Sequence, residues 1–300
     1  MTNFARIAAL LIALSVCGAS ANLAPAADKP PRLVEFESPL AGPQALQGYL
    51  RLPNGPGPSP AVVLLHGCGG GWRGLDERWG KLLAQWGYVT LTIDRFGTRA
   101  ITHACTAALP PSTLYDAYRA LDFLVEQPSV DPNRVAVVGF SQGAMLALLA
   151  VERGQIERSA KEKFRAAVDF YPPCRGLKGN MTVPTLILIG ELDHWTPAQE
   201  CRNLAEGRDD WGISREKGQG IPIEITVYPG AHHDFDVPLF RTPQKLVGHH
   251  LEFNEEARDR SVDALRKFLY ATIGGKRNNH DHQSRCVRCL WNALRHPVGG

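Results

Sequence analysis

The chain has 300 residues, of which 44% are hydrophobic and 21% charged, so it can bury the core of one large domain or two small ones. The formal net charge is only +3, and no long basic face precedes the C-terminal tail, which argues against a nucleic-acid partner.

The first 27 residues have the three parts of a secretory signal peptide. Arg6 precedes an apolar run at 7–16, and small residues follow at 19–21. An apolar run of this length is too short to span a bilayer. We therefore expect an exported protein, periplasmic or secreted, with no stable membrane insertion after residues 1–27 are removed.

Beyond this segment, the chain begins with two expected antiparallel strands at 33–38 and 46–52, and strands then alternate with helices. We expect further strands at 61–66, 88–94, 134–140, 164–171, 184–190 and 222–228, and helices at 76–86, 112–127 with Ser112 as N-cap, 142–153, from about Pro197, and at 254–273. This alternation predicts one α/β domain at 30–273, with a mostly parallel sheet and helices on both faces. Residues 206–220 are typical of a surface insertion, and 274–300 form a tail that we expect to be disordered.

Export would place the chain in an oxidising compartment, where cysteines pair. Six cysteines remain after removal of residues 1–27, an even number that fits disulfides: Cys68, Cys105, Cys174, Cys201, Cys286 and Cys289. Cys174 and Cys201 each follow the end of an expected strand, so we predict that they pair. Several buried free thiols are the alternative.

The most informative motif is G-F-S-Q-G at 139–143. It follows an expected buried strand and opens an expected helix, which is the context of a nucleophile elbow. The two glycines suit a bend in which bulky neighbours would collide, and the serine must take a strained conformation. Ser141 is therefore the predicted nucleophile, although a plain tight turn would use the same residues.

A serine hydroxyl needs a base, and the base needs a carboxylate that orients it. Hydrolases with this elbow place the acid and then the histidine later in the chain. Asp193 follows one later strand, and His232 and His233 follow the next. Asp169 is the rival acid, but it lies one strand earlier and inside that strand. The order favours Asp193 and leaves the choice of histidine open.

The oxyanion of an acyl-transfer reaction needs two backbone N–H donors near the serine. Gln142, directly after the nucleophile, is one candidate, and Cys68 in the HGCGGG loop at 66–71 is the other. A phosphate-binding role for this loop is disfavoured because the G-K-[ST] of a P-loop is missing.

Five stretches together resemble the dienelactone hydrolase family of α/β-hydrolases over residues 45–272. They are VVLLHGCGG, YVTLTIDRFGTR, VVGFSQGAM, LIGELDHWTP and YPGAHHDFD. The resemblance implies an α/β-hydrolase fold and places the family histidine on His233 rather than His232. The namesake enzymes carry cysteine where this chain has Ser141. GFSQG is also similar to the elbow of acyl-protein thioesterases.

These observations predict an exported serine hydrolase that cleaves a small-molecule carboxylic ester or lactone through Ser141, His233 and Asp193 and an acyl-enzyme. Trp72, Trp195 and Phe96 are candidates for an apolar pocket wall, and Arg95 and Arg99 for holding a substrate carboxylate, although solvated arginines and ordinary packing explain them as well. A thioesterase or peptidase of the same fold, or a non-catalytic binding protein on this scaffold, is the alternative.

We expect no cofactor and no metal. The one metal-like pattern is in the tail, where two histidines precede a C-x-x-C at 286–289. Its spacing matches no strong zinc motif, and a disordered or disulfide-linked tail fits such a short tract better.

Overall fold

The computed structural model describes residues 29–37, 45–208 and 219–275, and the structural statements below concern these ranges. The predicted signal peptide at 1–27, the core of the expected insertion at 209–218 and the tail from residue 276 onward lie outside the described residues.

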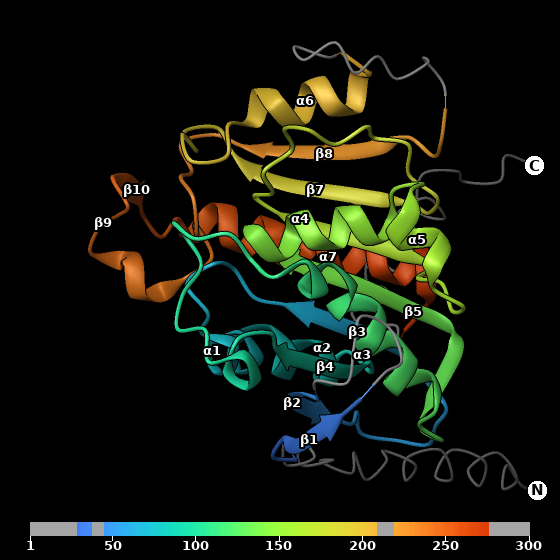
Figure 1. Cartoon of the computed structure of the whole chain (residues 1–300). Coiled ribbons are helices and arrows are strands. Elements are labelled where there is room, and N and C mark those ends of the chain that lie inside the picture. Colours follow the sequence, from blue (N-terminus) through green and yellow to red (C-terminus); the bar gives the residue numbers. More distant parts are fainter. Residues whose placement is uncertain (1–28, 38–44, 209–218, 276–300) are drawn as a thin grey trace, which may run out of the picture.

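Eight strands form one sheet that runs through the molecule (Figure 1). They are β1 (Arg32–Phe36), β2 (Leu46–Arg51), β3 (Ser59–Leu65), β4 (Val89–Asp94), β5 (Val130–Phe140), β6 (Ala166–Phe170), β7 (Thr185–Gly190) and β8 (Ile223–Tyr228). Their order across the sheet is β1-β2-β4-β3-β5-β6-β7-β8, with β3 to β8 parallel and only β1 and β2 antiparallel to their neighbours. The predicted α/β class with a mostly parallel sheet is confirmed.

Helices cover both faces of this sheet, which is why its central strands are continuous apolar runs. The helices are α1 (Trp72–Leu75), α2 (Lys81–Gln85), α3 (Asp116–Val125), α4 (Gln142–Val151), α5 (Gln155–Ser159), α6 (Ala198–Glu206) and α7 (Glu255–Ile273). On one face α3 packs against α4, where the Tyr118 hydroxyl donates to the Ala150 carbonyl at 2.6 Å. On the other face Arg266 of α7 lies over Trp86 at the end of α2.

Three expected helices differ in detail from the structure. The helix expected at 76–86 starts earlier, at α1, and passes through a π-helical turn, η1 (Asp76–Gly80). The helix expected at 112–127 opens with a three-ten turn, η3 (Pro111–Tyr115), so Ser112 is not its N-cap. The helix after the elbow ends at Val151, because Glu152 is extended and its carboxylate accepts the Gly179 N–H at 2.7 Å.

The sequence did not predict the short helix α5, the three-ten turn η2 (Gly97–Arg99) or a longer segment near the C-terminal helix. Between β8 and α7 the chain forms a three-ten turn, η4 (Pro238–Arg241), and a short antiparallel pair, β9 (Gln244–Leu246) and β10 (His249–Leu251). We call residues 237–253 the hairpin segment. It stands beyond the end of the sheet at which β7 and β8 finish (Figure 1). Its short, polar strands lack the long apolar alternation by which a strand is recognised in a sequence.

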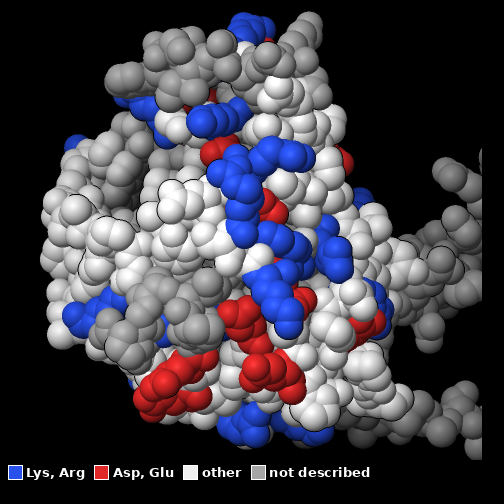
Figure 2. All heavy atoms as spheres, turned by 45° about the vertical axis from the view of Figure 1, so that its right-hand side comes forward, with Lys and Arg blue, Asp and Glu red and all other residues white. Residues whose placement is uncertain are grey.

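One side of the molecule carries a band of basic side chains (Figure 2). Figure 2 brings forward the side that lies on the right of Figure 1, away from the hairpin segment, and shows Lys and Arg in a band with acidic groups beside it. The chain around α5, on this side, carries Arg153, Arg158, Lys161, Lys163 and Arg165. The basic surface is therefore away from the strand ends that carry the candidate site. Among the described residues, no helix combines the length and the apolar character needed to cross a membrane.

Candidate active site

Ser141 sits on a sharp turn between β5 and α4, with φ 53° and ψ −118°. Such a backbone is strained for a residue with a side chain and persists only where the surroundings enforce it. Both glycines of the motif are required sterically. A Cβ on Gly139 would lie 2.4 Å from the Ala144 Cα, and one on Gly143 would lie 2.3 Å from the Leu65 carbonyl oxygen. The geometry is that of a nucleophile elbow.

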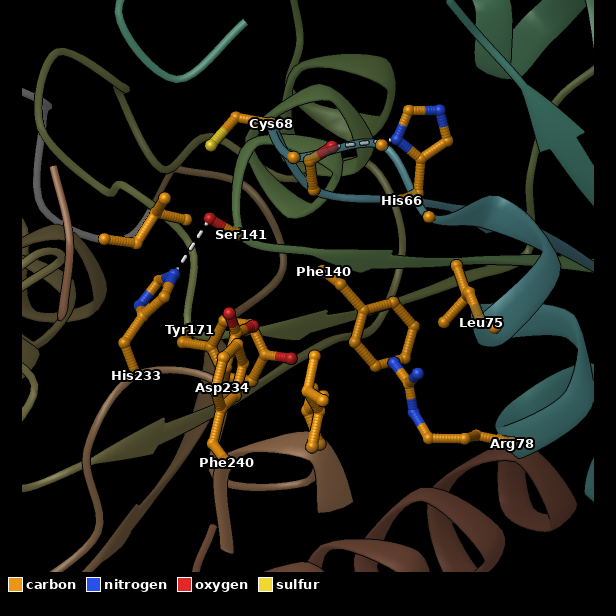
Figure 3. Close-up of a pocket in the computed structure, with 18 of the residues that line it drawn as sticks. His66, Cys68, Leu75, Arg78, Phe140, Ser141, Tyr171, His233, Asp234 and Phe240 are labelled. Atoms are coloured by element: carbon orange, nitrogen blue, oxygen red, sulfur yellow. Dashed lines mark hydrogen bonds between the residues drawn. The ribbon is translucent and has the colours of Figure 1, made fainter. Parts of the chain in front are cut away.

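Ser141, His233 and Asp193 form one hydrogen-bonded chain, and Figure 3 shows its contact between Ser141 and His233. The Ser141 Oγ lies 2.9 Å from His233 Nε2, and His233 Nδ1 lies 2.7 Å from Asp193 Oδ2. The carboxylate can only accept, so Nδ1 carries the proton and Nε2 is left to accept from the serine hydroxyl. Three residues that are 40 to 92 positions apart are thus brought together at the carboxyl ends of β5, β7 and β8.

The electrostatics of the pair follow from burial and contact. Burial disfavours the imidazolium, but the hydrogen bond and the negative charge of Asp193 outweigh it and raise the pKa of His233. Burial likewise works against the Asp193 carboxylate, while His233 and Thr196 donate to it, with the net effect that its pKa is lowered. Asp193 is therefore ionised at neutral pH and stabilises a proton on the histidine.

Asp193 is held by the turn that follows it. The backbone N–H groups of Trp195 and Thr196 both donate to Oδ1 at 2.9 Å, and the Thr196 hydroxyl donates to Oδ2 at 2.8 Å. Sequence reasoning missed Thr196. An aspartate followed two and three residues later by such donors is a common turn pattern, so D-H-W-T could have identified it.

The rival acid and the rival histidine lie elsewhere. Asp169 is fully buried inside β6, and neither of its carboxylate oxygens has a hydrogen-bond partner in the described part of the chain. Burial raises the pKa of Asp169 well above its usual value, which favours the uncharged carboxyl. The ring of His232 faces His250 and Glu252 instead of the serine.

The loop at 66–71 lies against the serine. A Cβ on Gly67 would lie 3.3 Å from the Ser141 Cβ. Ser141 N donates to the Phe170 carbonyl at 2.9 Å, whereas within the described ranges neither the Cys68 N–H nor the Gln142 N–H donates to an acceptor of the chain. Two free donors beside a serine hydroxyl are what an oxyanion hole requires.

A disulfide fixes this loop. Cys68 is bonded to Cys105, and its carbonyl accepts the Ala104 N–H at 2.8 Å. This bond was not predicted, because no spacing rule pairs two cysteines in different loops. The predicted Cys174–Cys201 disulfide is present and joins the chain after β6 to α6.

The two arginines predicted to bind a substrate carboxylate are engaged elsewhere. Arg95 is fully buried and donates to the His66 carbonyl, and burial lowers its pKa to about 10. Arg99 makes a bidentate ion pair with Asp116, at 2.7 and 2.8 Å. Neither lines the cavity described next. Both arginines instead hold the loops after β3 and β4 through hydrogen bonds and an ion pair. The sequence alone does not distinguish this structural role from substrate binding.

The serine opens into a cavity of about 400 Å³. Trp195 lines it and packs on His233, but Trp72 packs on Tyr49 and Phe96 on His66, so neither is in its wall. The wall has three parts that sequence reasoning missed: Leu75 and Arg78 from the helical segment, Tyr171 after β6, and the hairpin segment with Val237, Pro238, Leu239, Phe240 and Leu246. In Figure 3, Arg78 enters from the side opposite Asp234 and Phe240.

A buried carboxylate links these wall elements. Asp236 accepts from the Tyr171 hydroxyl at 2.6 Å and from the Trp79 indole at 2.7 Å. Its neighbours therefore come from the end of β6 and from η1, and the hairpin segment starts directly after it. Tyr171 also packs on the ring of His233, with centroids 4.7 Å apart. Tyr171 follows a strand end, the same position that identified the triad residues, and could have been listed on that ground.

Comparison with curated proteins gives relatives that are longer than this chain. Esterase EstD of Thermotoga maritima is 30% identical over 170 residues, which are 54% of this chain and 38% of that protein. A Mycobacterium tuberculosis protein with a provisional phosphoribosyl transferase name is 26% identical over 228 residues, 73% of this chain and 46% of that protein. The chain thus spans about half, or less, of the length of these relatives.

Solved structures share the fold. A dienelactone hydrolase-like promiscuous phosphotriesterase from metagenomic libraries matches with a TM-score of 0.61 at 21% identity, covering 81% of this chain and 98% of that one. A thermophilic esterase of Thermogutta terrifontis matches with a TM-score of 0.59 at 18% identity, covering 83% and 95%. The family model of the dienelactone hydrolases matches residues 46–272, from the first residue of β2 almost to the end of α7. With the family model matched over most of its length, the chain belongs to the dienelactone hydrolase family.

Proposed function

We propose that the protein is a serine hydrolase that cleaves a small carboxylic ester or lactone. The observation that carries this proposal is the chain of contacts from Asp193 through His233 to the Ser141 hydroxyl, at 2.7 and 2.9 Å, beside the cavity. A binding protein on the same scaffold has no need of a strained serine aligned with a base and an acid.

In the proposed reaction the Ser141 oxygen attacks the substrate carbonyl carbon while His233 Nε2 takes the hydroxyl proton. The negative charge that forms on the carbonyl oxygen is stabilised by the Cys68 and Gln142 N–H groups. Collapse breaks the ester C–O bond, and His233 returns the proton to the leaving alkoxide. Water then attacks the acyl-enzyme with the same base, which releases the acid and restores Ser141.

The cavity supports a small, largely apolar substrate. Its volume of about 400 Å³ is within the ordinary range for small-molecule sites, and Leu75, Phe140, Trp195 and the hairpin segment supply apolar wall. The esterase name of the Thermotoga relative favours an ester over an amide. Arg78 lies in this wall, 3.9 Å from the buried Asp236 carboxylate, and the part of its guanidinium that faces the cavity would favour a substrate with an acidic group.

The decisive test compares Ser141→Ala with Ser159→Ala, an exposed serine on α5, which lies on the side of the molecule away from the hairpin segment (Figure 1). Ester and lactone hydrolysis should fall by at least about 10⁴-fold in the first variant, as when a triad member is lost, and stay at the wild-type level in the second. Labelling by a fluorophosphonate should follow the same pattern. Wild-type turnover or labelling in Ser141→Ala would refute the proposal.

The base is tested in the same way with a matched histidine. His233→Ala should lose activity to a similar extent, whereas His103→Ala, an exposed residue of the loop after β4, should keep it. Equal loss in the two variants would show that His233 has no special role.

We also infer that the protein is exported. Two disulfides support this, because stable disulfides form mainly in oxidising compartments. Intact-mass analysis of protein recovered from periplasm or medium should show a chain that starts near Asn22 or Asp28 and carries both bonds. A full-length reduced chain confined to the cytoplasm would contradict the inference.

A further inference from the structure

A cluster of metal-ligating side chains lies outside the catalytic contacts, next to the loop that carries His233. His232, His250 and Glu252 each offer one donor atom, and these three atoms lie within 4.8 Å of one another. The Nε2 of His250 is 2.7 Å from the Glu252 Oε2, and the Nε2 of His232 is 3.9 Å from the same oxygen. The imidazole rings of His232 and His250 are in contact, with centroids 4.2 Å apart and ring planes tilted by 53°.

The donor set selects a class of ion. Two imidazole nitrogens and one carboxylate oxygen suit zinc and similar divalent transition metals, whereas calcium and magnesium prefer oxygen donors alone. Tetrahedral bonds of about 2.0–2.2 Å place neighbouring donors roughly 3.4 Å apart. The separations here approach that value, and small side-chain rotations would close them.

The three side chains are partly exposed, which leaves room for that adjustment. Their exposed fractions are 22% for His232, 31% for His250 and 43% for Glu252, so they are neither locked in the core nor fully solvated. This exposure also leaves a coordination position for water, as in zinc sites with three protein ligands.

Two further histidines are nearby but are engaged in other contacts. His249 stacks on Trp195, with centroids 4.7 Å apart and ring planes 5° from parallel. The Nε2 of His194 accepts the backbone N–H of His250 at 3.4 Å. Consecutive residues of β10 point to opposite sides, which separates His249 from His250. His249 is therefore a matched control that belongs to the same strand.

The position of the cluster gives it a consequence. His233 and Leu251 form an isolated parallel bridge, which is a backbone contact between the loop that carries His233 and the hairpin segment. His232 is the neighbour of His233 in this bridge, and His250 and Glu252 are the two neighbours of Leu251. The hairpin segment supplies Leu239, Phe240 and Leu246 to the cavity wall. An ion held by the three residues would fasten that wall to the loop of the catalytic base.

We propose that His232, His250 and Glu252 bind one divalent transition-metal ion of the zinc class, which clamps the hairpin segment to the loop that carries His233. The ion takes no part in the proposed ester hydrolysis, so the proposal stands or falls independently of that function.

The test uses the full chain, treated with chelator and dialysed, and titrates it with Zn²⁺ by calorimetry and with Co²⁺ by visible absorption. The variants are His250→Ala and Glu252→Gln, with His249→Ala as the control. His232→Ala is avoided because it neighbours the catalytic base. Circular dichroism verifies that each variant is folded.

Wild type and His249→Ala should bind one ion at this site, with visible Co²⁺ bands of low-coordinate geometry. His250→Ala and Glu252→Gln should each weaken that binding by at least about 100-fold, since even outer partners of a metal site are worth 10- to 100-fold. Zn²⁺ should raise the Tm, and slow hydrogen exchange at 244–251, only where the site is intact. An ion held by the cysteines of the tail would survive all three substitutions.

Two results would overturn the proposal. One is Zn²⁺ binding with the same affinity and stoichiometry in wild type, His250→Ala and Glu252→Gln. The other is a response to Ca²⁺ or Mg²⁺ equal to that for Zn²⁺, which would refute the assigned class of ion.

Discussion

At the scale of single residues, the elbow depends on Gly139 and Gly143, which have no side chain, as much as on Ser141. Of the two glycines, Gly143 lies against the loop after β3. A Cβ added to it would lie 2.3 Å from the Leu65 carbonyl oxygen and 2.6 Å from the His66 carbonyl oxygen. Both obstacles are backbone atoms and cannot rotate away. The loop after β3 would have to move, and this loop carries the Cys68 N–H.

Gly143→Ala is therefore expected to lower stability by about 1–3 kcal/mol, the usual cost of overpacking, and to lower kcat further by displacing Cys68. Gly154→Ala is the matched control, since its Cβ would meet only the Glu152 carbonyl at 3.8 Å. Urea unfolding and ester hydrolysis measure the two effects. An unchanged kcat in Gly143→Ala would show that the oxyanion loop tolerates the shift.

At the scale of elements, the strands of the sheet position Ser141, Asp193 and His233, and two disulfides hold loops at the same end of the sheet. Cys68–Cys105 and Cys174–Cys201 close segments of similar length, with sequence separations of 37 and 27. In the chain-entropy picture each contributes about 4 kcal/mol, so the two bonds should matter almost equally for stability. Only the first holds a residue, Cys68, whose N–H we propose as an oxyanion donor.

Replacing either pair with two serines should thus lower the free energy of unfolding by similar amounts. The Cys68→Ser/Cys105→Ser variant should in addition lose kcat, by up to about 10²-fold, the lower range for loss of one oxyanion donor. The Cys174→Ser/Cys201→Ser variant should keep kcat at temperatures where it is folded. Equal kcat in both double variants would mean that the first disulfide does not position the loop.

At the scale of the whole molecule, one group works against stability at neutral pH. Asp169 lies inside the central sheet, and its two oxygens have no hydrogen-bond partner among the described residues. Burial raises its pKa well above the usual value. In the unfolded chain the same carboxyl ionises above about pH 4. Unfolding therefore releases a proton, and the contribution of Asp169 to stability falls as pH rises above 4.

Asp169→Leu, which is close to isosteric, is expected to be more stable than wild type at pH 7. Burial of a polar group without a hydrogen-bond partner costs about 1–3 kcal/mol in the free energy of unfolding, and this part of the gain should remain at pH 3. The gain should be smaller at pH 3, where the unfolded wild type is also protonated. Urea unfolding at both pH values measures it. A variant that is less stable at pH 7 would show that the carboxyl has a partner or a role of its own.

The sequence by itself determined the α/β class and the alternation of strands and helices along the chain, and it predicted the elbow at Ser141. Continuous valine-rich runs, helical spacing and obligatory glycines are local properties, and they act within a few residues. The Cys174–Cys201 pair also followed from strand ends. Because strand ends meet at one edge of a parallel sheet, even the candidate acid and base could be listed from their positions.

Only the tertiary structure decided which of those candidates touch. It placed Asp193 and His233 in line with Ser141, enclosed Asp169 in the sheet, and turned His232 toward His250 and Glu252. It also took Arg95 and Arg99 out of the cavity and put Arg78, Tyr171 and the hairpin segment in its wall. These outcomes depend on the direction of each side chain and on contacts between segments far apart in the chain. Local sequence patterns do not determine either of these, because a shift of one residue along a strand turns a side chain to the opposite face.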